Sequence, residues 1–507
     1  MKITQNAKFA IEQAPKYPGS HIAKLPEWYD ESRRQFEEYM KTTEPLQYPL
    51  LSIQKKSVAH AVASKYTPIF DDMGTGKTAQ SLAVSVLGGH RHTMIVCPNA
   101  LKQNWIEEIQ KFTSTALSEI FVGKGRDLSM LPSSICTNFR FFIFNYEAAP
   151  VACKTPDIIP AALKLCSHII FDEVHAIKNA MTKLYQSWYY LLYHNPPNQL
   201  TLLTGTPFDR YVGELYSYFQ LLDLNPSVPG MPFTHEFPNA TAWDQRFAIP
   251  RGKDSFYSYA PSELPVIRNI FGRRPVRRAI TDVMEMPPKH NQNIDLPDHL
   301  FKKEDMAELE GKFKWALRMM ASQDQKKKIG EKEMTTMGAI QKIRVEISYA
   351  KTPYTSEMVE RYIREHGPVV VFFEFVEPLK KFQDGLEKKG YKVCIVHGSM
   401  ADYDQRFAIE QFKKGEVHVI AASFGTLAEG VNLQRSNVVF FNDIPWRPLL
   451  ISQAERRVWR IGQKRPCYQV SMLCRVDGII LRNIMGKNAY ISDLYGILSH
   501  IREKENL

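Results

Sequence analysis

The chain has 507 residues, of which 44% are hydrophobic and 23% are charged, and this is the composition of an ordinary globular protein. No apolar run approaches the roughly 18 residues that a membrane-spanning helix needs, and the seven scattered cysteines have the spacing of neither a disulfide framework nor a zinc site. The net charge of +11 favours a polyanionic partner, with a surplus for solubility as the alternative.

Short apolar runs alternate with helical stretches in the first half of the chain, which predicts a parallel sheet with right-handed crossovers. The predicted strands are residues 67–70, 93–97, 139–145, 169–171 and 200–203. The clearest predicted helix carries four apolar residues on one face, namely Leu101, Trp105, Ile109 and Phe112.

A phosphate-binding motif follows the first predicted strand, at residues 71–78 (DDMGTGKT). Gly74 and Gly76 let the backbone curl so that its N–H groups face a β-phosphate, and Lys77 reaches the β and γ oxygens. The Thr78 hydroxyl can bind Mg²⁺. The nucleotide-binding residues that this motif predicts are Met73, Gly74, Thr75, Gly76, Lys77 and Thr78.

A second motif, residues 172–175 (DEVH), follows the apolar run 168–171. That run suits a buried parallel strand, which would deliver two carboxylates at its C-terminal end. Asp172 would hold Mg²⁺ and Glu173 would orient the attacking water. Either motif alone could be accidental, but the two in this order predict nucleoside triphosphate hydrolysis.

Two histidines, His90 and His92, flank Arg91 beside the second predicted strand. A metal-binding pair is one interpretation, but the nearby sequence offers no third ligand, so we expect exposed loop histidines. Trp105, at its helical spacing, is expected in the core.

The middle of the chain is irregular and basic. Residues 225–265 are rich in proline, glycine and aromatics, which predicts an ordered but irregular excursion, and residues 300–345 look helical. The run Lys326 to Lys328 is open to two interpretations, a solvated helix end or a DNA-facing basic edge. A second block of strand signals then predicts a second α/β lobe, with strands at 369–373, 393–396, 417–421, 438–441 and 470–473.

Residues 453–463 (QAERRVWRIGQ) lie within that second block. Arg457 and Arg460 are three residues apart, so on a helix they would share a face and point at a γ-phosphate together. An arginine placed there neutralises the charge that develops as the phosphoryl group departs. An ion-paired surface helix is the alternative, but the flanking Gln-Ala and Ile-Gly-Gln argue against it.

These motifs, in this order from about residue 47 to 475, resemble the Swi/Snf family of helicase-like ATPases that translocate on double-stranded DNA, within helicase superfamily two. The most specific match is residues 277–283 (RRAITDV) with 286–289 (MPPK), which resemble the linker that braces the family's two halves. Further matches are the segments LSIQ (51–54), VCPNALKQNW (96–105), NYE (145–147), TGTP (204–207), HGS (397–399), SFGTLAEGVNL (423–433) and DIPWRP (443–448).

The resemblance implies an α/β fold with two RecA-like parallel-sheet lobes in tandem and a helical, partly irregular insertion between them. ATP and Mg²⁺ would occupy the cleft between the lobes, so that closure brings Arg460, with Arg457, onto the nucleotide. The implied boundaries are an N-terminal extension (1–46), an ATP-binding lobe (47–224), an insertion with brace and helical protrusion (225–355), a helicase C-terminal lobe (356–485) and a tail (486–507).

The resemblance also assigns residues beyond the two hydrolytic motifs. Gln54 would read the adenine, and Gly430 and Gln453 would complete the ATP site. The residues implied in DNA binding, or in coupling it to hydrolysis, are Pro98, Lys102, Tyr146, Thr204, Thr206, Ser423, Thr426 and Trp446.

The implied function is an ATP-dependent translocase on double-stranded or branched DNA, used in repair, fork remodelling or protein displacement. A strand-separating helicase acting on RNA or forked DNA, and a binding module that has lost hydrolysis, are the alternatives. The lean chain leads us to expect a compact viral or prokaryotic member, located in the cytoplasm of a prokaryote or an infected host cell, or in the nucleus if it is eukaryotic.

Overall fold

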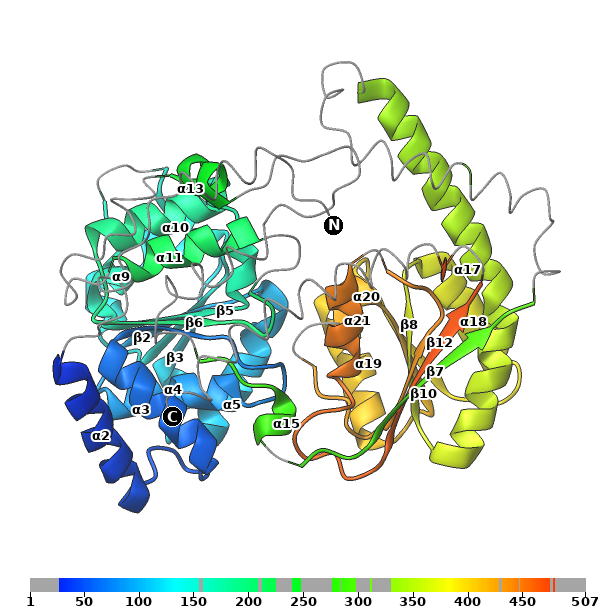
Figure 1. The fold of residues 1–507 in the computed structure, drawn as a ribbon, viewed down its shortest axis with the longest axis horizontal. Helices are drawn as coiled ribbons and strands as arrows, with labels where there is room; N and C mark the ends of the chain where they lie inside the picture. The colour runs from blue at the N-terminus through cyan, green and yellow to red at the C-terminus, as the bar shows by residue number, and fades with distance from the viewer. Residues whose placement is uncertain are drawn as a thin grey trace, which may run out of the picture. The chain divides into compact units, whose positions relative to one another are not determined.

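The computed structural model describes the chain as two compact α/β units (Figure 1). In the described part of the chain, the first unit extends to Val283 and the second begins at Glu285. The described residues are 27–154, 158–207, 212–224, 239–247, 276–283, 285–297, 311, 330–427, 431–445, 447–474 and 477–478.

The first unit is built on a six-stranded sheet in the order β1-β6-β5-β2-β4-β3, in which every pairing is parallel. Most of its strands are buried at every position rather than at alternate positions, because helices cover both faces of the sheet (Figure 1). The strands are β1 (Tyr66–Ile69), β2 (Thr93–Val96), β3 (Ile120–Val122), β4 (Phe141–Phe144), β5 (His168–Asp172) and β6 (Gln199–Leu203).

Helices α2 to α5 lie on one side of this sheet, and α9, α10, α11 and α13 lie on the other (Figure 1). The α-helices are α2 (Glu27–Thr42), α3 (Ser52–Ser64), α4 (Lys77–Leu87), α5 (Lys102–Phe112), α6 (Asp127–Met130), α7 (Ser133–Cys136), α8 (Ala148–Ala152), α9 (Ala161–Leu165), α10 (Lys183–His194), α11 (Tyr216–Leu222), α13 (Ala240–Phe247) and α15 (Ile280–Val283). Short 3₁₀ helices occupy η1 (Asn99–Leu101), η2 (Leu117–Glu119), η3 (Val174–Ile177) and η4 (Val212–Leu215).

The second unit repeats the architecture with the strand order β7-β12-β11-β8-β10-β9, again parallel throughout. Its strands are β7 (Lys289–Asp295), β8 (Val369–Phe373), β9 (Val393–Val396), β10 (Val419–Ser423), β11 (Val438–Phe441) and β12 (Cys467–Leu473). Its helices are α17 (Gly330–His366), α18 (Val376–Glu387), α19 (Asp402–Lys414), α20 (Phe424–Leu427) and α21 (Pro448–Glu455).

The predicted fold class is confirmed, because two parallel α/β sheets follow one another along the chain. Two strands are missing from the prediction. β3 has only three residues and lies at a sheet edge, and β7 (KHNQNID) is polar and mostly exposed although it pairs with β12 over seven residues. A search for apolar runs overlooks strands of this kind, since an edge strand does not have to bury both of its faces.

The middle of the chain is described only in part. The predicted helix at 300–345 is confirmed from Gly330 onward, where α17 continues past the predicted boundary at residue 355 to His366. The run Lys326 to Lys328 lies outside the described residues, as does most of 225–265. Along the described ranges, no helix is both long and apolar enough to span a membrane. The domain boundaries stay a prediction.

The linker leaves the first unit along the free edge of β1. Val276 forms a parallel bridge with Ile69, its N–H donates to the Pro68 carbonyl at 2.9 Å, and its carbonyl accepts from Phe70 N–H at 2.7 Å. The linker therefore extends the sheet at the strand that leads into residues 71–78.

Candidate active site

Three loops meet at the carboxyl edge of the first sheet, because the strands that precede them are neighbours in the order β1-β6-β5. They are residues 71–78 after β1, 204–206 after β6, and 172–173 at the end of β5. Ligands of open parallel sheets bind at this edge. The fold thus brings together segments that lie about a hundred residues apart in the sequence.

The loop after β1 has the backbone geometry of an anion site. Gly74 and Gly76 have φ angles of 82° and 80°, in the left-handed region that favours glycine. Gly76 is also the N-cap of α4, so the loop amides lie at the positive end of an eleven-residue helix. A Cβ at Gly76 would lie 2.5 Å from Gln54 Nε2, so a side chain there would displace that amide.

Lys77 is the cation of this loop. Its Nζ donates to the backbone carbonyls of Asp71, at 2.9 Å, and Asp72, at 3.1 Å. Burial lowers the pKa of Lys77, and the nearby carboxylates, with Glu173 the strongest, oppose that shift. The ammonium therefore lies among negative groups and carbonyls that hold it at the loop, where it can bind phosphate oxygens.

Asp172 ends β5 with both carboxylate oxygens hydrogen-bonded. Oδ2 accepts from the indole Nε1 of Trp105 at 2.8 Å, and Oδ1 accepts from Glu173 N–H at 3.0 Å. Burial, and then the charge of Glu173, raise the pKa of Asp172 to about 7. Two carboxylates side by side in a buried position favour a cation, which would restore the ionised form of Asp172.

Glu173 has a strained backbone, with φ 50° and ψ 51°, which is unusual for a residue other than glycine. Strain of this kind persists where the surroundings impose it, and it concentrates at functional sites. Its Oε2 lies 3.2 Å from His175 Nδ1 and accepts from the Thr204 hydroxyl at 3.4 Å. The carboxylate is therefore tied to the loop that follows the neighbouring strand.

That loop, residues 204–206, packs directly on the phosphate-binding loop. Thr204 Oγ1 accepts from Thr206 N–H at 3.1 Å, while the Thr206 hydroxyl is buried without a hydrogen-bond partner among the described atoms. A Cβ at Gly205 would lie 2.6 Å from Met73 Cγ and 3.5 Å from Lys77 Nζ. The predicted coupling residues Thr204 and Thr206 thus adjoin the hydrolytic residues.

The side chains fit Mg²⁺. Thr78 and Asp172 supply hard oxygen ligands, and no group of three or more His, Cys, Asp or Glu in the described part of the chain forms a cage of protein ligands. Mg²⁺ typically binds through one or two protein oxygens together with substrate phosphates and water.

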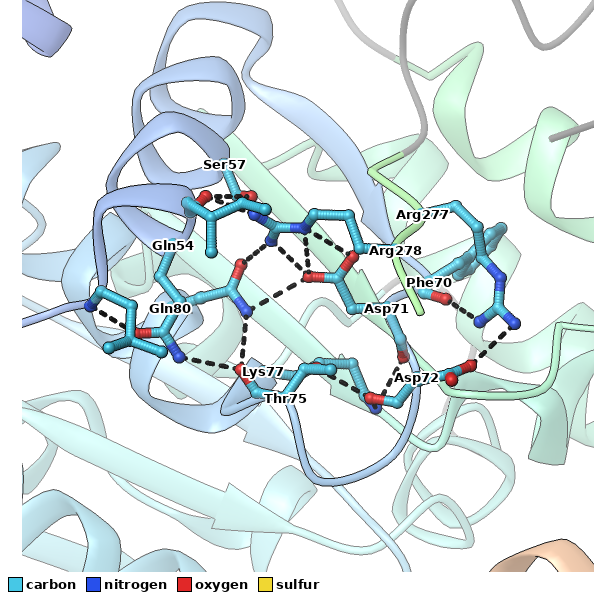
Figure 2. A network of polar contacts seen from close by, with 12 residues as sticks. Gln54, Ser57, Phe70, Asp71, Asp72, Thr75, Lys77, Gln80, Arg277 and Arg278 are labelled. Carbon is cyan, nitrogen blue, oxygen red and sulfur yellow. Dashed lines mark hydrogen bonds and ion pairs between the residues drawn. The ribbon is translucent and has the colours of Figure 1, made fainter. Parts of the chain in front are cut away.

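Two linker arginines clamp the phosphate-binding loop (Figure 2). Arg278, 3% exposed, forms a buried ion pair with Asp71, with its Nε at 3.1 and 3.2 Å from the two carboxylate oxygens, and it also donates to Gln80 Oε1 at 2.9 Å. Arg277 binds Asp72 Oδ1 at 2.9 Å and the Gly205 carbonyl at 3.2 Å. The sequence suggested a brace between halves and did not reveal this contact with the loop.

Gln54 supports the same loop from α3. Its Nε2 donates to the Thr75 carbonyl at 2.8 Å, and its Oε1 accepts from Leu51 N–H at 2.9 Å (Figure 2). The predicted role of Gln54 in reading adenine stays a prediction.

The predicted role of Lys102 in binding DNA needs correction. Lys102 is 8% exposed, and its Nζ donates to the Gly123 carbonyl at 2.7 Å and to Asn145 Oδ1 at 3.2 Å. Burial lowers the pKa of Lys102. The side chain therefore joins two segments of the first unit, and the ammonium is already satisfied inside the protein.

Of the other predicted DNA residues of this unit, Tyr146 contacts the hydrolytic pair. Tyr146 is buried, and its hydroxyl donates to the Asp172 carbonyl at 2.7 Å. Pro98 is half-buried and lies two residues after the end of β2. Tyr146 fits coupling to the hydrolytic site better than direct contact with DNA.

The two histidines near β2 are not exposed, contrary to the prediction. His90 is half-buried with Nδ1 2.9 Å from Ser167 Oγ, and His92 is buried with Nδ1 2.8 Å from the Phe139 carbonyl. Burial lowers the pKa of His90 to about 4.

The argument that placed Arg457 and Arg460 on one helical face is wrong. Helix α21 ends at Glu455, and residues 456–462 form turns. Arg457 is 6% exposed and donates to the carbonyls of Gln453, at 3.1 Å, and Val431, at 3.4 Å, whereas Arg460 is half-buried. The two arginines belong to one turn segment but do not share a helix.

The remaining predicted residues of the second unit are only partly described. The hydroxyls of Ser423 and Thr426 lie 2.7 Å apart at the carboxyl end of β10. Gln453 is buried, and its Oε1 has no hydrogen-bond partner among the described atoms. Gly430 and Trp446 lie outside the described residues.

Comparison with known proteins gives matches to two family models. Residues 54–344 match the SNF2-related domain, and residues 354–462 match the helicase conserved C-terminal domain. Together these matches extend over parts of both units.

Several curated proteins are similar to the chain. It is 25% identical over 80% of its length to "Probable chromatin-remodeling complex ATPase chain" of Oryza sativa subsp. japonica. It is 24% identical to "DNA annealing helicase and endonuclease ZRANB3" of Mus musculus over 82% of its length, and 24% identical to "Putative ATP-dependent helicase/translocase YwqA" of Bacillus subtilis (strain 168) over 78%. The chain spans 36%, 38% and 42% of the lengths of these three relatives.

Among solved structures, the chain is similar to "Sulfolobus solfataricus SWI2/SNF2 ATPase core in complex with dsDNA". The identity is 20% and the TM-score 0.39, and the match covers 85% of this chain and 89% of that chain.

Proposed function

The chain belongs to the SNF2-related family of DNA-dependent, helicase-like ATPases, and from that premise we propose that it moves along double-stranded DNA at the expense of ATP hydrolysis. The observation that carries the proposal is the geometry at the carboxyl edge of the first sheet. Lys77 comes from the loop after β1, and Asp172 and Glu173 come from the end of β5. The fold brings these two segments to one edge, and hydrogen bonds fix the three side chains there.

Each of these residues has a chemical task in phosphoryl transfer. The loop amides and the Lys77 ammonium bind the phosphates, and Glu173 orients the attacking water. Thr78 and Asp172 would hold Mg²⁺, which would offset the negative charge of the phosphates. Because Thr204 bonds to Glu173, a movement of the loop after β6 reaches the residue that positions the water.

Arg460 stays the proposed arginine that neutralises charge on the departing phosphoryl group, with Arg457 as its support. Arg457 already bonds to two carbonyls of its own unit, so it holds the turn rather than the phosphate in this conformation. This division makes Arg460 the residue whose loss costs turnover most directly.

Duplex DNA is the proposed track. The net charge of +11 suits a phosphate backbone, and the name of one relative, a DNA annealing helicase, supports action on DNA. The name of another, a helicase/translocase, supports translocation. Thr204, Thr206 and Tyr146 would couple DNA binding to hydrolysis, and Pro98, Ser423 and Thr426 stay proposed contacts. Branched DNA, repair, fork remodelling or protein displacement, and a prokaryotic, viral or nuclear setting are proposals of the same kind.

ATP turnover with single-stranded, double-stranded and branched DNA and with RNA tests the proposal, together with ATP-driven displacement of a third strand from a DNA triplex. We expect stimulation by duplex DNA and displacement of the third strand without separation of the duplex, and we expect Lys77→Ala to abolish both. Separation of forked duplex or RNA would favour the strand-separating helicase instead, and no turnover with any substrate would favour the hydrolysis-dead module.

A further inference from the structure

Trp105 has a contact that neither its packing nor its motif explains. The side chain is fully buried on α5, and its indole Nε1 donates to Asp172 Oδ2 at 2.8 Å. The other oxygen, Oδ1, accepts from Glu173 N–H. One hydrogen bond to each oxygen fixes the rotation of the Asp172 carboxylate.

The position of this indole follows from the sheet order. Strand β2 lies beside β5, so Val96 pairs with Phe171, and α5 follows β2 after one short 3₁₀ turn. Trp105 shares the buried face of α5 with Ile109, whose apolar side chain packs in the same core. A leucine or phenylalanine would serve that packing, but only an indole adds a donor aimed at the end of β5.

The backbone of Asp172 is held as firmly as its side chain. The Tyr146 hydroxyl donates to its carbonyl at 2.7 Å, and the Tyr146 carbonyl in turn accepts from Trp188 Nε1 at 2.8 Å. The Tyr146 and Phe171 rings stack with centroids 5.9 Å apart. The only part of Asp172 left to rotate is its carboxylate, and the Trp105 bond restricts that rotation.

We propose that Trp105 is a positioning residue for ATP hydrolysis, holding the Asp172 carboxylate in the orientation that binds the divalent cation. The inference rests on the proposed function, since it explains how the same ATP site orients a carboxylate that binds the metal ion. Hydrogen-bond partners of metal-binding carboxylates change metal affinity or activity by about 10- to 100-fold when they are removed. The indole N–H is such a partner.

The test replaces Trp105 with benzothienylalanine, an isostere in which sulfur takes the place of the N–H, by site-specific incorporation into the full chain. The first readout is Mn²⁺ binding to the ADP-bound protein, followed by electron paramagnetic resonance without turnover. We expect Mn²⁺ affinity to fall about 10-fold. The Mg²⁺ concentration that half-saturates ATP turnover should rise by a similar factor, with the thermal midpoint and metal-free ADP binding unchanged. Trp105→Phe should shift the metal dependence in the same direction.

Benzothienylalanine at position 243 is the matched control, because Trp243 is also fully buried in the first unit and packs on Phe219 with ring centroids 5.5 Å apart. It should leave Mn²⁺ affinity unchanged. If the Trp105 analogue binds Mn²⁺ as tightly as the unmodified protein, Trp105 only fills the core and the inference fails while the proposed function stands. If the unmodified protein itself neither hydrolyses ATP nor binds metal with ADP, the proposed function fails and takes the inference with it.

Discussion

Single residues at the phosphate-binding loop depend on backbone freedom. At Gly76, a φ of 80° and the Gln54 amide 2.5 Å from an added Cβ both oppose any side chain. We predict that Gly76→Ala lowers stability by about 1–2 kcal/mol through the left-handed backbone alone and weakens nucleotide binding as well. Thermal unfolding and titration with a fluorescent ADP analogue measure the two effects.

Gly89→Ala is the control for that substitution. Gly89 also has a positive φ, 68°, but an added Cβ would meet nothing within 4 Å. It should therefore reduce stability while leaving ADP affinity as in the wild type. If Gly76→Ala and Gly89→Ala bind ADP with equal affinity, then nucleotide binding by the loop does not depend on Gly76.

Acid should destabilise the first unit through His90, which is half-buried, and His168, which is fully buried. The pKa of His90 lies near 4 instead of 6.5 because of burial, and that of His168 lies well below 6.5 for the same reason. Between pH 6.5 and 4 the unfolded chain binds protons that the folded chain does not, so stability is lost as the pH falls through this window.

We predict that His90→Asn makes the thermal midpoint less dependent on pH between 7 and 4.5. The same substitution at His194, which is exposed, serves as the control and should leave the pH profile unchanged. Parallel profiles for the wild type and His90→Asn, measured by calorimetry, would disprove the role of His90.

Among single residues, the sequence correctly predicted that the residues of the two hydrolytic motifs lie together. Lys77, Asp172 and Glu173 lie together as expected because their motifs encode local backbone shapes. The Trp105–Asp172 bond and the burial of Lys102 were not predictable, since both depend on segments 67 and 21 residues away. The residues next to a lysine in the sequence do not indicate that its side chain will be buried.

At the scale of elements, two arginines of the linker hold the phosphate-binding loop in place. We predict that Arg278→Met, which leaves Asp71 buried without its partner, lowers stability by about 3–5 kcal/mol and weakens ADP binding. Adding Asp71→Asn should restore part of that loss, because the uncompensated charge is then gone. Chemical unfolding of the single and double variants measures the coupling.

The control for that cycle is Lys41→Met, which breaks an exposed ion pair with Glu38 on α2. Exposed pairs contribute little, so its unfolding should match that of the wild type. If the stability losses of Arg278→Met and Asp71→Asn simply add in the double variant, the two residues do not stabilise the loop as a pair.

The end of α21 shows why the boundaries of helices could not be predicted from the sequence. The segment after Glu455 looked helical, but tertiary hydrogen bonds hold its carbonyls instead. The Arg457 carbonyl accepts from Leu433 N–H at 3.0 Å, and the Arg460 carbonyl accepts from Gln434 Nε2 at 3.1 Å. Long-range bonds of this kind override local helix propensity.

At the scale of the whole molecule, the surplus of positive charge predicts a strong dependence on salt. Cations released from DNA phosphates favour binding at low salt, so the DNA concentration that half-stimulates ATP turnover should rise steeply, by about 10-fold or more, between 50 and 200 mM salt. ADP binding without DNA should change much less over that range. If the stimulation of ATP turnover by DNA did not depend on salt, the protein would not bind DNA mainly through its phosphate backbone.

The most direct test of the account is ATP turnover by the full chain on duplex DNA, compared between the wild type and Arg460→Ala. Removing a charge-neutralising arginine costs about 10³-fold or more in turnover when that residue stabilises phosphoryl transfer. We predict a loss of that size with ADP affinity retained. Hydrolysis by Arg460→Ala at the wild-type rate would contradict the role proposed for Arg460.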